Sequence, residues 1–154
     1  MSEISKIVLT AILTIAGGVI VYALGHLSVA LIVMPIHRLR GLIGEIAYSL
    51  VFYASVYGNP GSVKQEIMDE AGEMLRRQAS ELRASEHTIP CYPIWAGIKL
   101  VPGKKNIQEA SAELIGLSNS VHGGPGVSPT GNIEKAIRIQ QFLGIEISKR
   151  KKKQ

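Results

Sequence analysis

Residues 7–34 read IVLTAILTIAGGVIVYALGHLSVALIVM, and this stretch decides the fold because it contains no Lys, Arg, Asp or Glu. A soluble helix of this length needs a polar face, and the stretch has none. About 20 apolar residues are enough to cross the hydrocarbon core of a bilayer. The stretch therefore predicts a transmembrane helix, which serves as a membrane anchor over residues 1–36.

A cleaved signal peptide is the alternative interpretation. Lys6 gives a small positive region before the stretch, and Ala23-Leu24-Gly25 resembles a small-x-small cleavage site. Apolar residues nevertheless continue for more than one helical turn beyond that site, where a signal peptide has normally ended. We therefore favour a retained anchor.

Charges on either side of the anchor predict its orientation. Lys6 and Glu3 precede it, whereas Arg38 and Arg40 follow it. Positive residues favour the cytoplasmic side, so we expect a single-pass protein of the cell membrane with a cytoplasmic C-terminal domain. The single cysteine of the chain suits a reducing compartment.

Small residues form a stripe on the anchor at Thr10, Thr14, Gly18 and Gly25. Small side chains let two membrane helices approach closely, so this stripe is the predicted packing surface of a homo-oligomer. His26 is the ionisable residue within the anchor, and we interpret it as a neutral imidazole near one end.

A second helix is predicted over residues 37–58, because apolar side chains recur on one helical face. Pro35 lacks an amide hydrogen, so we expect the first helix to end or kink there. The second helix would lie in the membrane interface, with tyrosines at headgroup level, or pack on its own domain. A second membrane crossing is the alternative, and Glu45 would cost about 3 kcal/mol at the bilayer centre. The apolar face consists of Leu39, Leu42, Ile43, Ile46, Leu50, Tyr53, Ala54 and Tyr57.

Residues 59–147 predict a small α-helical domain. Ser62 with Gln65 and Asn106 with Glu109 have the spacing of capping boxes, and Asn132 is the predicted cap of a last helix that ends at Gly144. Between the helices, residues 89–103 contain three prolines and the only tryptophan. They predict a buried extended segment or short strand, with Trp95 as a core plug or partner-binding patch.

Residues 122–131 form a Gly-rich loop before the last predicted helix. Such a loop can hold an anion on backbone amides, so Gly123, Gly124, Gly126 and Asn132 are candidate anion-binding residues. The Gly-Lys-Ser/Thr ending of a phosphate-binding Walker loop is missing, however. A flexible surface connection is the simpler interpretation.

The sequence predicts no catalytic residue, metal site or cofactor. Cys91 with His87 or His122 would make a thiol–imidazole pair, but Cys91 lies in an apolar stretch where cysteine usually acts as a small hydrophobe. The four histidines lack the i, i+3 or i, i+4 spacing that a helical zinc site would use.

Residues 148–154 form a basic tail that is predicted to be disordered. It supplies five positive charges to a chain whose formal net charge is +5. Solvated tail, lipid contact and nucleic-acid contact are the three interpretations, and the last lacks a recognisable nucleic-acid fold. The predicted contacts with lipid headgroups are Arg38, Arg40, Lys149, Arg150, Lys151, Lys152 and Lys153.

Together these features predict a mainly α protein: a transmembrane helix, an interfacial amphipathic helix, a small helical domain with a Pro-rich extended segment, and a basic tail. The favoured function is a membrane-anchored scaffold or regulator that acts through protein or lipid contacts. The alternatives are a membrane-bound enzyme or ligand-binding domain that uses the loop at residues 122–131, and a membrane-tethered nucleic-acid binder. The sequence favours a non-enzymatic role, with membrane lipid and a second copy of the chain as partners.

Overall fold

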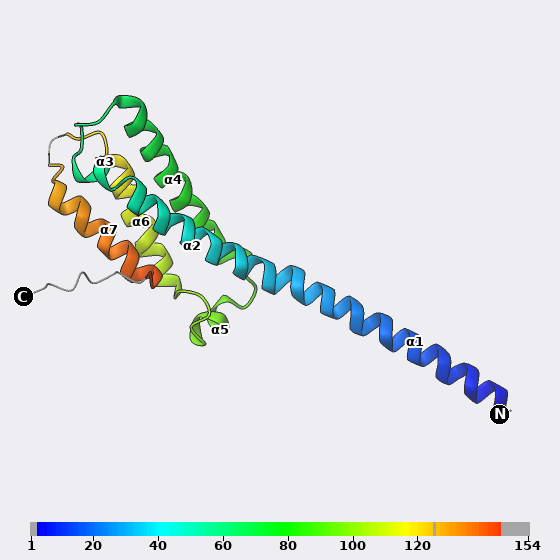
Figure 1. The fold of residues 1–154 in the computed structure, drawn as a ribbon. Helices are drawn as coiled ribbons and strands as arrows, with labels where there is room; N and C mark the ends of the chain where they lie inside the picture. Colours follow the sequence, from blue (N-terminus) through cyan, green and yellow to red (C-terminus); the bar gives the residue numbers. More distant parts are fainter. Residues whose placement is uncertain (1–2, 125, 146–154) are drawn as a thin grey trace, which may run out of the picture.

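The computed structural model describes residues 3–124 and 126–145. This part of the chain is helical, without a strand, and consists of a small helix bundle carried at one end of a long projecting helix (Figure 1). Mainly α architecture is therefore confirmed, and so is the long apolar helix near the N-terminus. The basic tail at residues 148–154 lies outside the described residues.

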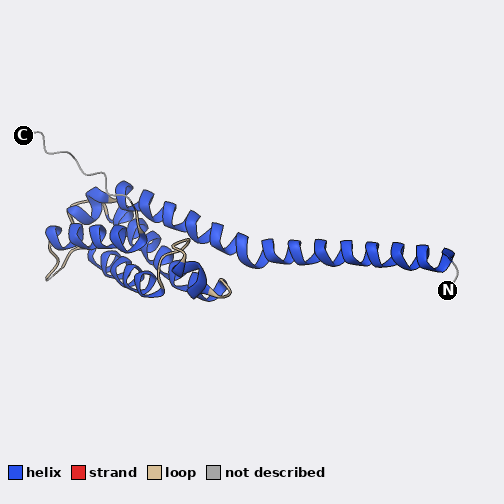
Figure 2. Cartoon of the chain, turned by 90° about the horizontal axis from the view of Figure 1, so that it is seen from below, coloured by secondary structure: helices blue, strands red, loops and turns tan. Residues whose placement is uncertain are grey.

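One helix of 50 residues runs without a break through Glu3–Phe52. It comprises α1 (Glu3–Ser28), a π-helical turn (Val29–Val33) and α2 (Met34–Phe52). At 1.5 Å per residue its length is about 75 Å. Figure 2 shows the same long rod from a second direction.

The long helix continues through Pro35, where the sequence had predicted an end or a kink. Instead, the preceding turn widens, and the Met34 amide donates to the Val29 carbonyl five residues back. A wider turn relieves the clash that the pyrrolidine ring makes with the backbone before it. The continuous helix also excludes a hairpin between residues 7–34 and residues 41–57.

The α2 helix packs within the bundle along one face. The buried side chains on this face include Leu39, Leu42, Ile46 and Leu50, which are among the residues that the sequence pattern had selected. Of the two placements predicted for this apolar face, the structure shows packing on the protein's own domain and not exposure to the membrane interface. Tyr48 and Phe52 are exposed on the opposite side and stack with ring centroids 5.5 Å apart.

Of the five described helices that follow the long rod, four complete the bundle around one apolar core. A short helix, α3 (Ala54–Gly58), leads to α4 (Gln65–Thr88), which packs along α2. Next, α6 (Lys104–Ser120) packs between α4 and α7 (Pro129–Leu143). The bundle is held by apolar contacts, and its fully buried side chains include Leu75, Leu114, Leu117 and Ile139.

The predicted N-caps are wrong at all three helices. The N-cap residues in the structure are Lys64, two residues after Ser62, Gly103, three residues before Asn106, and Ser128, four residues before Asn132. None of these three residues makes a side-chain capping bond. The predicted C-terminal stop is confirmed, since Gly144 adopts the left-handed conformation with φ of 68° after the last residue of α7.

Residues 89–103 contain a short helix, α5 (Tyr92–Gly97), where an extended segment or strand had been predicted. Pro93 lies in its first turn, where a missing amide hydrogen costs nothing because that amide has no helical partner. Tyr92 is buried, whereas most of the rest of α5 is exposed. The segment is therefore a small projection from the bundle.

Candidate functional site

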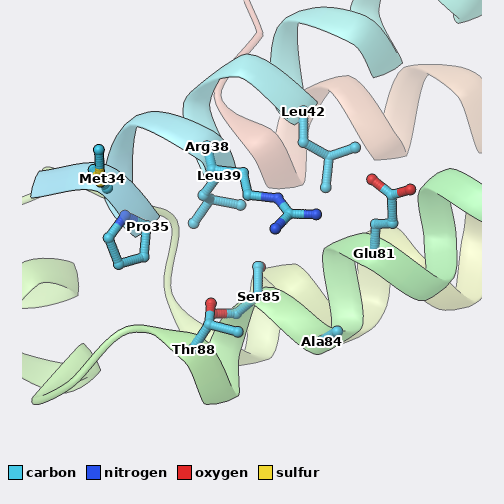
Figure 3. A pocket seen from close by; sticks show the side chains of 9 residues that line it. All are labelled: Met34, Pro35, Arg38, Leu39, Leu42, Glu81, Ala84, Ser85 and Thr88. Atoms are coloured by element: carbon cyan, nitrogen blue, oxygen red, sulfur yellow. The ribbon is translucent and has the colours of Figure 1, made fainter. Parts of the chain in front are cut away.

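A groove of about 470 Å³ lies between α2 and α4 where the long helix leaves the bundle. Leu39 and Leu42 form its apolar floor, and Figure 3 shows Arg38 extending into it with Glu81 on the opposite wall. The α2 side carries the apolar and basic lining, and the α4 side carries mostly small or polar residues. The residues that line the groove are Met34, Pro35, Arg38, Leu39, Leu42, Glu81, Ala84, Ser85 and Thr88.

Helix periodicity explains why Arg38 and Leu39 differ so strongly in environment. Leu39 is 1% exposed in the core, while its neighbour Arg38 is turned by about 100° and faces the groove. Among the described residues, Arg38 and Glu81 do not come within ion-pair distance of each other. The groove therefore combines an apolar floor with a cation that can contact an external anionic group.

A second hollow, of about 560 Å³, lies beside Arg40 on the other side of α2. It is bounded by Lys99, the backbone that follows α5 and the C-terminal end of α7. The Arg40 Nε atom donates to the Leu100 carbonyl at 3.3 Å, which ties α2 to the segment after α5. Arg38 and Arg40, predicted together as headgroup contacts, thus face different hollows at the same end of the bundle.

The Gly-rich loop is fastened to α4 and is not arranged as an open cradle. The His122 Nε2 atom lies 2.7 Å from Asp69 Oδ1, and the Gly61 amide donates to the Val121 carbonyl just before the loop. This hydrogen bond with His122 lowers the pKa of the Asp69 carboxyl, burial opposes the shift, and a bond from Gln65 adds to it. Gly123, Gly124 and Gly126 all have positive φ, as the turns of the loop require.

Asn132 lies apart from the exposed glycines and is 1% exposed inside the bundle. Its Nδ2 atom donates to the Tyr57 carbonyl at 2.9 Å, and its Oδ1 atom accepts from Ser120 Oγ at 2.8 Å. Its side chain therefore joins α3, α6 and α7, and both ends of its amide are already occupied. The Asn132 side chain therefore has no free group for an anion at the loop.

The predicted stripe on α1 is fully exposed. The Thr10 and Thr14 hydroxyls donate to the Lys6 and Thr10 carbonyls at 2.9 and 2.8 Å, which satisfies both groups within the helix. A methyl group at Gly18 or Gly25 would meet nothing within 4 Å in the single chain. The stripe thus leaves room for close approach by another helix.

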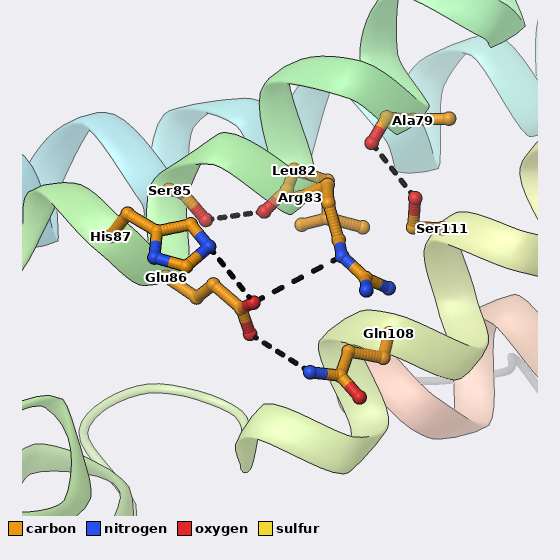
Figure 4. Close-up of polar contacts among 8 residues, drawn as sticks. All are labelled: Ala79, Leu82, Arg83, Ser85, Glu86, His87, Gln108 and Ser111. Atoms are coloured by element: carbon orange, nitrogen blue, oxygen red, sulfur yellow. Dashed lines mark hydrogen bonds and ion pairs between the residues drawn. The ribbon is translucent and has the colours of Figure 1, made fainter.

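A buried carboxylate, Glu86, lies near the C-terminal end of α4 (Figure 4). Its Oε1 atom is 3.3 Å from His87 Nε2 and 3.9 Å from Arg83 Nε, and its Oε2 atom accepts from Gln108 Nε2 at 3.4 Å. Burial raises the pKa of Tyr92 to about 12, and the charge of Glu86 adds to that shift. Because Glu86 is covered and partnered, it links α4 to α6 and is not a ligand-facing group.

The exposed apolar surface of α5 was not predicted from the sequence. Ile94 and Ile98 had been expected in a buried segment, but they are 60% and 64% exposed. Their i, i+4 spacing was a usable signal, since it places both side chains on one face if the segment is helical. Cys91, at the start of α5, is exposed and free.

Among residues 3–124 and 126–145 there is no group of three or more His, Cys, Asp or Glu side chains that would hold a metal ion. No protein-family model, curated protein or solved structure matches the chain. The described part of the chain is a small helical bundle carried on one long apolar helix. A basic, hollowed surface lies where the bundle and the long helix meet.

Proposed function

We propose that the chain is a membrane-anchored helical module that acts as a scaffold or regulator through protein or lipid contacts. In this proposal α1 spans the cell membrane and the bundle lies against the cytoplasmic face. The observation that carries the proposal is that α1 has no buried residue, although its side chains are overwhelmingly apolar.

The exposed apolar surface of α1 is too large for a monomer in water. Ile7, Leu13 and Val19 are each at least 62% exposed, and their positions are spaced evenly around the helix. Soluble monomers seldom expose contiguous apolar patches beyond a few hundred Å². The uncharged run of residues 7–34 is about 42 Å long, which exceeds the roughly 30 Å thickness of the hydrocarbon core.

Basic residues at the end of the bundle support a position at an anionic membrane face. Arg38, Arg40, Lys99, Lys104 and Lys105 are all exposed there. Each such residue near acidic headgroups adds about 1 kcal/mol of attraction. Because α2 continues the direction of α1, Tyr48 would lie about 20 Å beyond Met34 and away from the headgroups, where its exposed ring is available to a protein partner.

Fractionation of cells that express the full chain tests the anchor. We expect the chain in the membrane fraction after washes with high salt or alkaline carbonate, and in the soluble fraction only after detergent treatment. A chain that salt alone releases would contradict a spanning helix, because salt screens charges but leaves apolar burial intact.

Reporter fusions at both ends test the orientation. A reporter that is active only in the cytoplasm should work at the C-terminus and fail at the N-terminus. The same signal from both ends would contradict a single crossing. The matched control is a chain that lacks residues 1–28, whose two ends should report the same compartment.

A further inference from the structure

The exposed face of α5 is an apolar feature of the bundle that the anchor alone does not explain, and it lies apart from the exposed Tyr48, Val51 and Phe52 of α2. Ile94 and Ile98 lie one helical turn apart, since the Ile98 amide donates to the Ile94 carbonyl at 3.1 Å. Their side chains are 60% and 64% exposed, compared with 38% for Ile67 and 48% for Ile133 elsewhere on the bundle. Because they are exposed and one helical turn apart, the two isoleucine side chains form a small, continuous apolar surface.

The structure fixes α5 with this face outward. The buried Tyr92 donates its hydroxyl to the Pro102 carbonyl at 2.8 Å, and Trp95 Nε1 donates to the Pro90 carbonyl at 2.9 Å. Cys91 and Lys99, at the two ends of α5, both have positive φ, of 53° and 60°. Residues other than glycine rarely adopt this conformation, so the bundle must hold both ends of α5 in place.

The position of α5 indicates what covers this face. It projects from the end of the bundle where the long helix leaves, as Figure 1 shows. The bond from Arg40 to the Leu100 carbonyl fixes this placement only about two helical turns beyond the uncharged run of residues 7–34. Lys99 directly follows the isoleucines, and Lys104 and Lys105 begin the next helix, all of them exposed.

We propose that α5 is a second membrane contact, which inserts Ile94 and Ile98 into the interfacial layer of the bilayer that α1 spans, with the neighbouring lysines at anionic headgroups. This inference rests on the proposed function, since it uses the bilayer that α1 enters. An apolar tip flanked by lysines and a tryptophan has the composition of interfacial membrane contacts, where isoleucine leaves water, Trp lies at headgroup level and Lys meets phosphate.

Trp95 allows a direct test because it is the only tryptophan in the chain. The full chain is reconstituted into vesicles of phosphatidylcholine and phosphatidylglycerol, with or without lipids brominated on their acyl chains. We expect brominated lipid to quench Trp95 fluorescence, most strongly when the bromine lies near the headgroup end of the chain. Quenching that is absent in vesicles which hold the protein would overturn the inference.

Two variants assign the contact to the isoleucines. Ile94→Ser/Ile98→Ser should lose most of the quenching, while Ile67→Ser/Ile133→Ser, changed at exposed isoleucines on the first turns of α4 and α7, should retain it. Equal quenching in both variants would overturn the role of α5. Circular dichroism of each variant establishes that the bundle is folded, and quenching of the unaltered chain remains decisive if one variant unfolds.

Vesicle flotation separates this inference from the proposed function. If the chain floats with vesicles but Trp95 is not quenched, α1 is anchored and α5 does not insert. If the chain does not float, the anchor itself fails, and the inference fails with it.

Discussion

Ser49 and Gln78 place a hydrogen bond inside the otherwise apolar contact between α2 and α4. Gln78 Nε2 donates to Ser49 Oγ at 2.8 Å, and each residue is 3% exposed. The other amide atom, Gln78 Oε1, has no partner among the described residues. A polar pair in this position fixes how α2 is aligned along α4, because any other alignment would leave both groups buried without a partner.

Removing one member of this pair should be worse than removing both. We expect Ser49→Ala to lower the free energy of unfolding by about 1–2 kcal/mol, because it leaves the Gln78 amide buried without a partner. Ser49→Ala/Gln78→Met should recover most of that loss. Urea unfolding in detergent micelles, followed by Trp95 fluorescence, measures both. A double variant less stable than Ser49→Ala would contradict this account.

Asn132 shows how a residue pattern can mislead. Asparagine before a helical pattern usually caps the helix, but here Pro129 starts α7 three residues earlier and turns Asn132 into the core. Tertiary hydrogen bonds to Tyr57 and Ser120 decide its role, and no local pattern reveals them.

Asn132→Leu should therefore destabilise the bundle more than loss of a surface cap would. The change leaves the Tyr57 carbonyl without its buried partner, at about 1–3 kcal/mol, while the Ser120 hydroxyl keeps the Leu117 carbonyl as an acceptor at 2.9 Å. The same urea titration measures the loss, and Asn106→Leu, at an exposed position in α6, is the control. Equal effects of the two changes would argue against the buried network.

The contact between Asp69 and His122 predicts an acid sensitivity. Because the pKa of Asp69 is lowered from 3.8 in the folded state, its stabilising effect is present above pH 3.8 and is lost as the pH falls through the folded pKa. Hydrogen exchange at Gly123 should accelerate relative to other amides over this interval. Asp69→Asn should already show the faster exchange at neutral pH and lose the acid transition. A transition that persists in Asp69→Asn would assign it to another group.

At the scale of helices, the sequence predicted which faces are buried better than where helices begin and end. The apolar face of α2 followed from its 3.6-residue period, since burial depends on the sum of many side chains. Helix starts and ends depend on single residues and are harder to predict. Pro35 does not end the first helix, and Ser62, Asn106 and Asn132 are not the N-caps of the helices near them. At the candidate site, Arg38 and Arg40 each line a hollow at the end of the bundle that carries the long helix, and their contact with lipid headgroups stays a prediction. The groove and the orientation of α5 depend on contacts between distant segments.

The close approach of α4 to α6 depends on Gly72. A methyl group there would lie 3.3 Å from Val121 Cγ2 and 3.4 Å from the Ser118 carbonyl oxygen. We expect Gly72→Leu to overpack this contact and to destabilise the bundle by about 1–3 kcal/mol. Gly116→Leu is the matched control, since its neighbours are the flexible end of Lys135 at 3.7 Å or more. If both variants have the same urea midpoint, the close contact at Gly72 does not restrict the size of the side chain there.

At the scale of the whole molecule, the long rod and the bundle make separate contributions. Neither α1 nor the π-helical turn contributes a buried residue, whereas α2 supplies part of the core. Residues 3–28 therefore contribute nothing to the apolar core, whereas Ile32 of the π-helical turn packs against it.

Deleting residues 1–28 should leave the stability of the bundle unchanged. We expect its urea midpoint to match that of the full chain in the same detergent, because no core contact is removed. The shortened chain should also leave the membrane fraction under high-salt washing, when headgroup attraction is screened. A large drop in midpoint would show that α1 packs on the bundle, contrary to the structure.

Because α1 continues into α2 as one helix, the tilt of α1 and the orientation of the bundle are linked. A spanning helix whose apolar length exceeds the thickness of the bilayer adapts mainly by tilting from the bilayer normal. Because the helix is continuous from α1 to α2, any change in its tilt would rotate the bundle through the same angle. Local bilayer thickness would then set how closely the bundle approaches the lipid surface, and the chain would convert a property of the membrane into the orientation of its bundle.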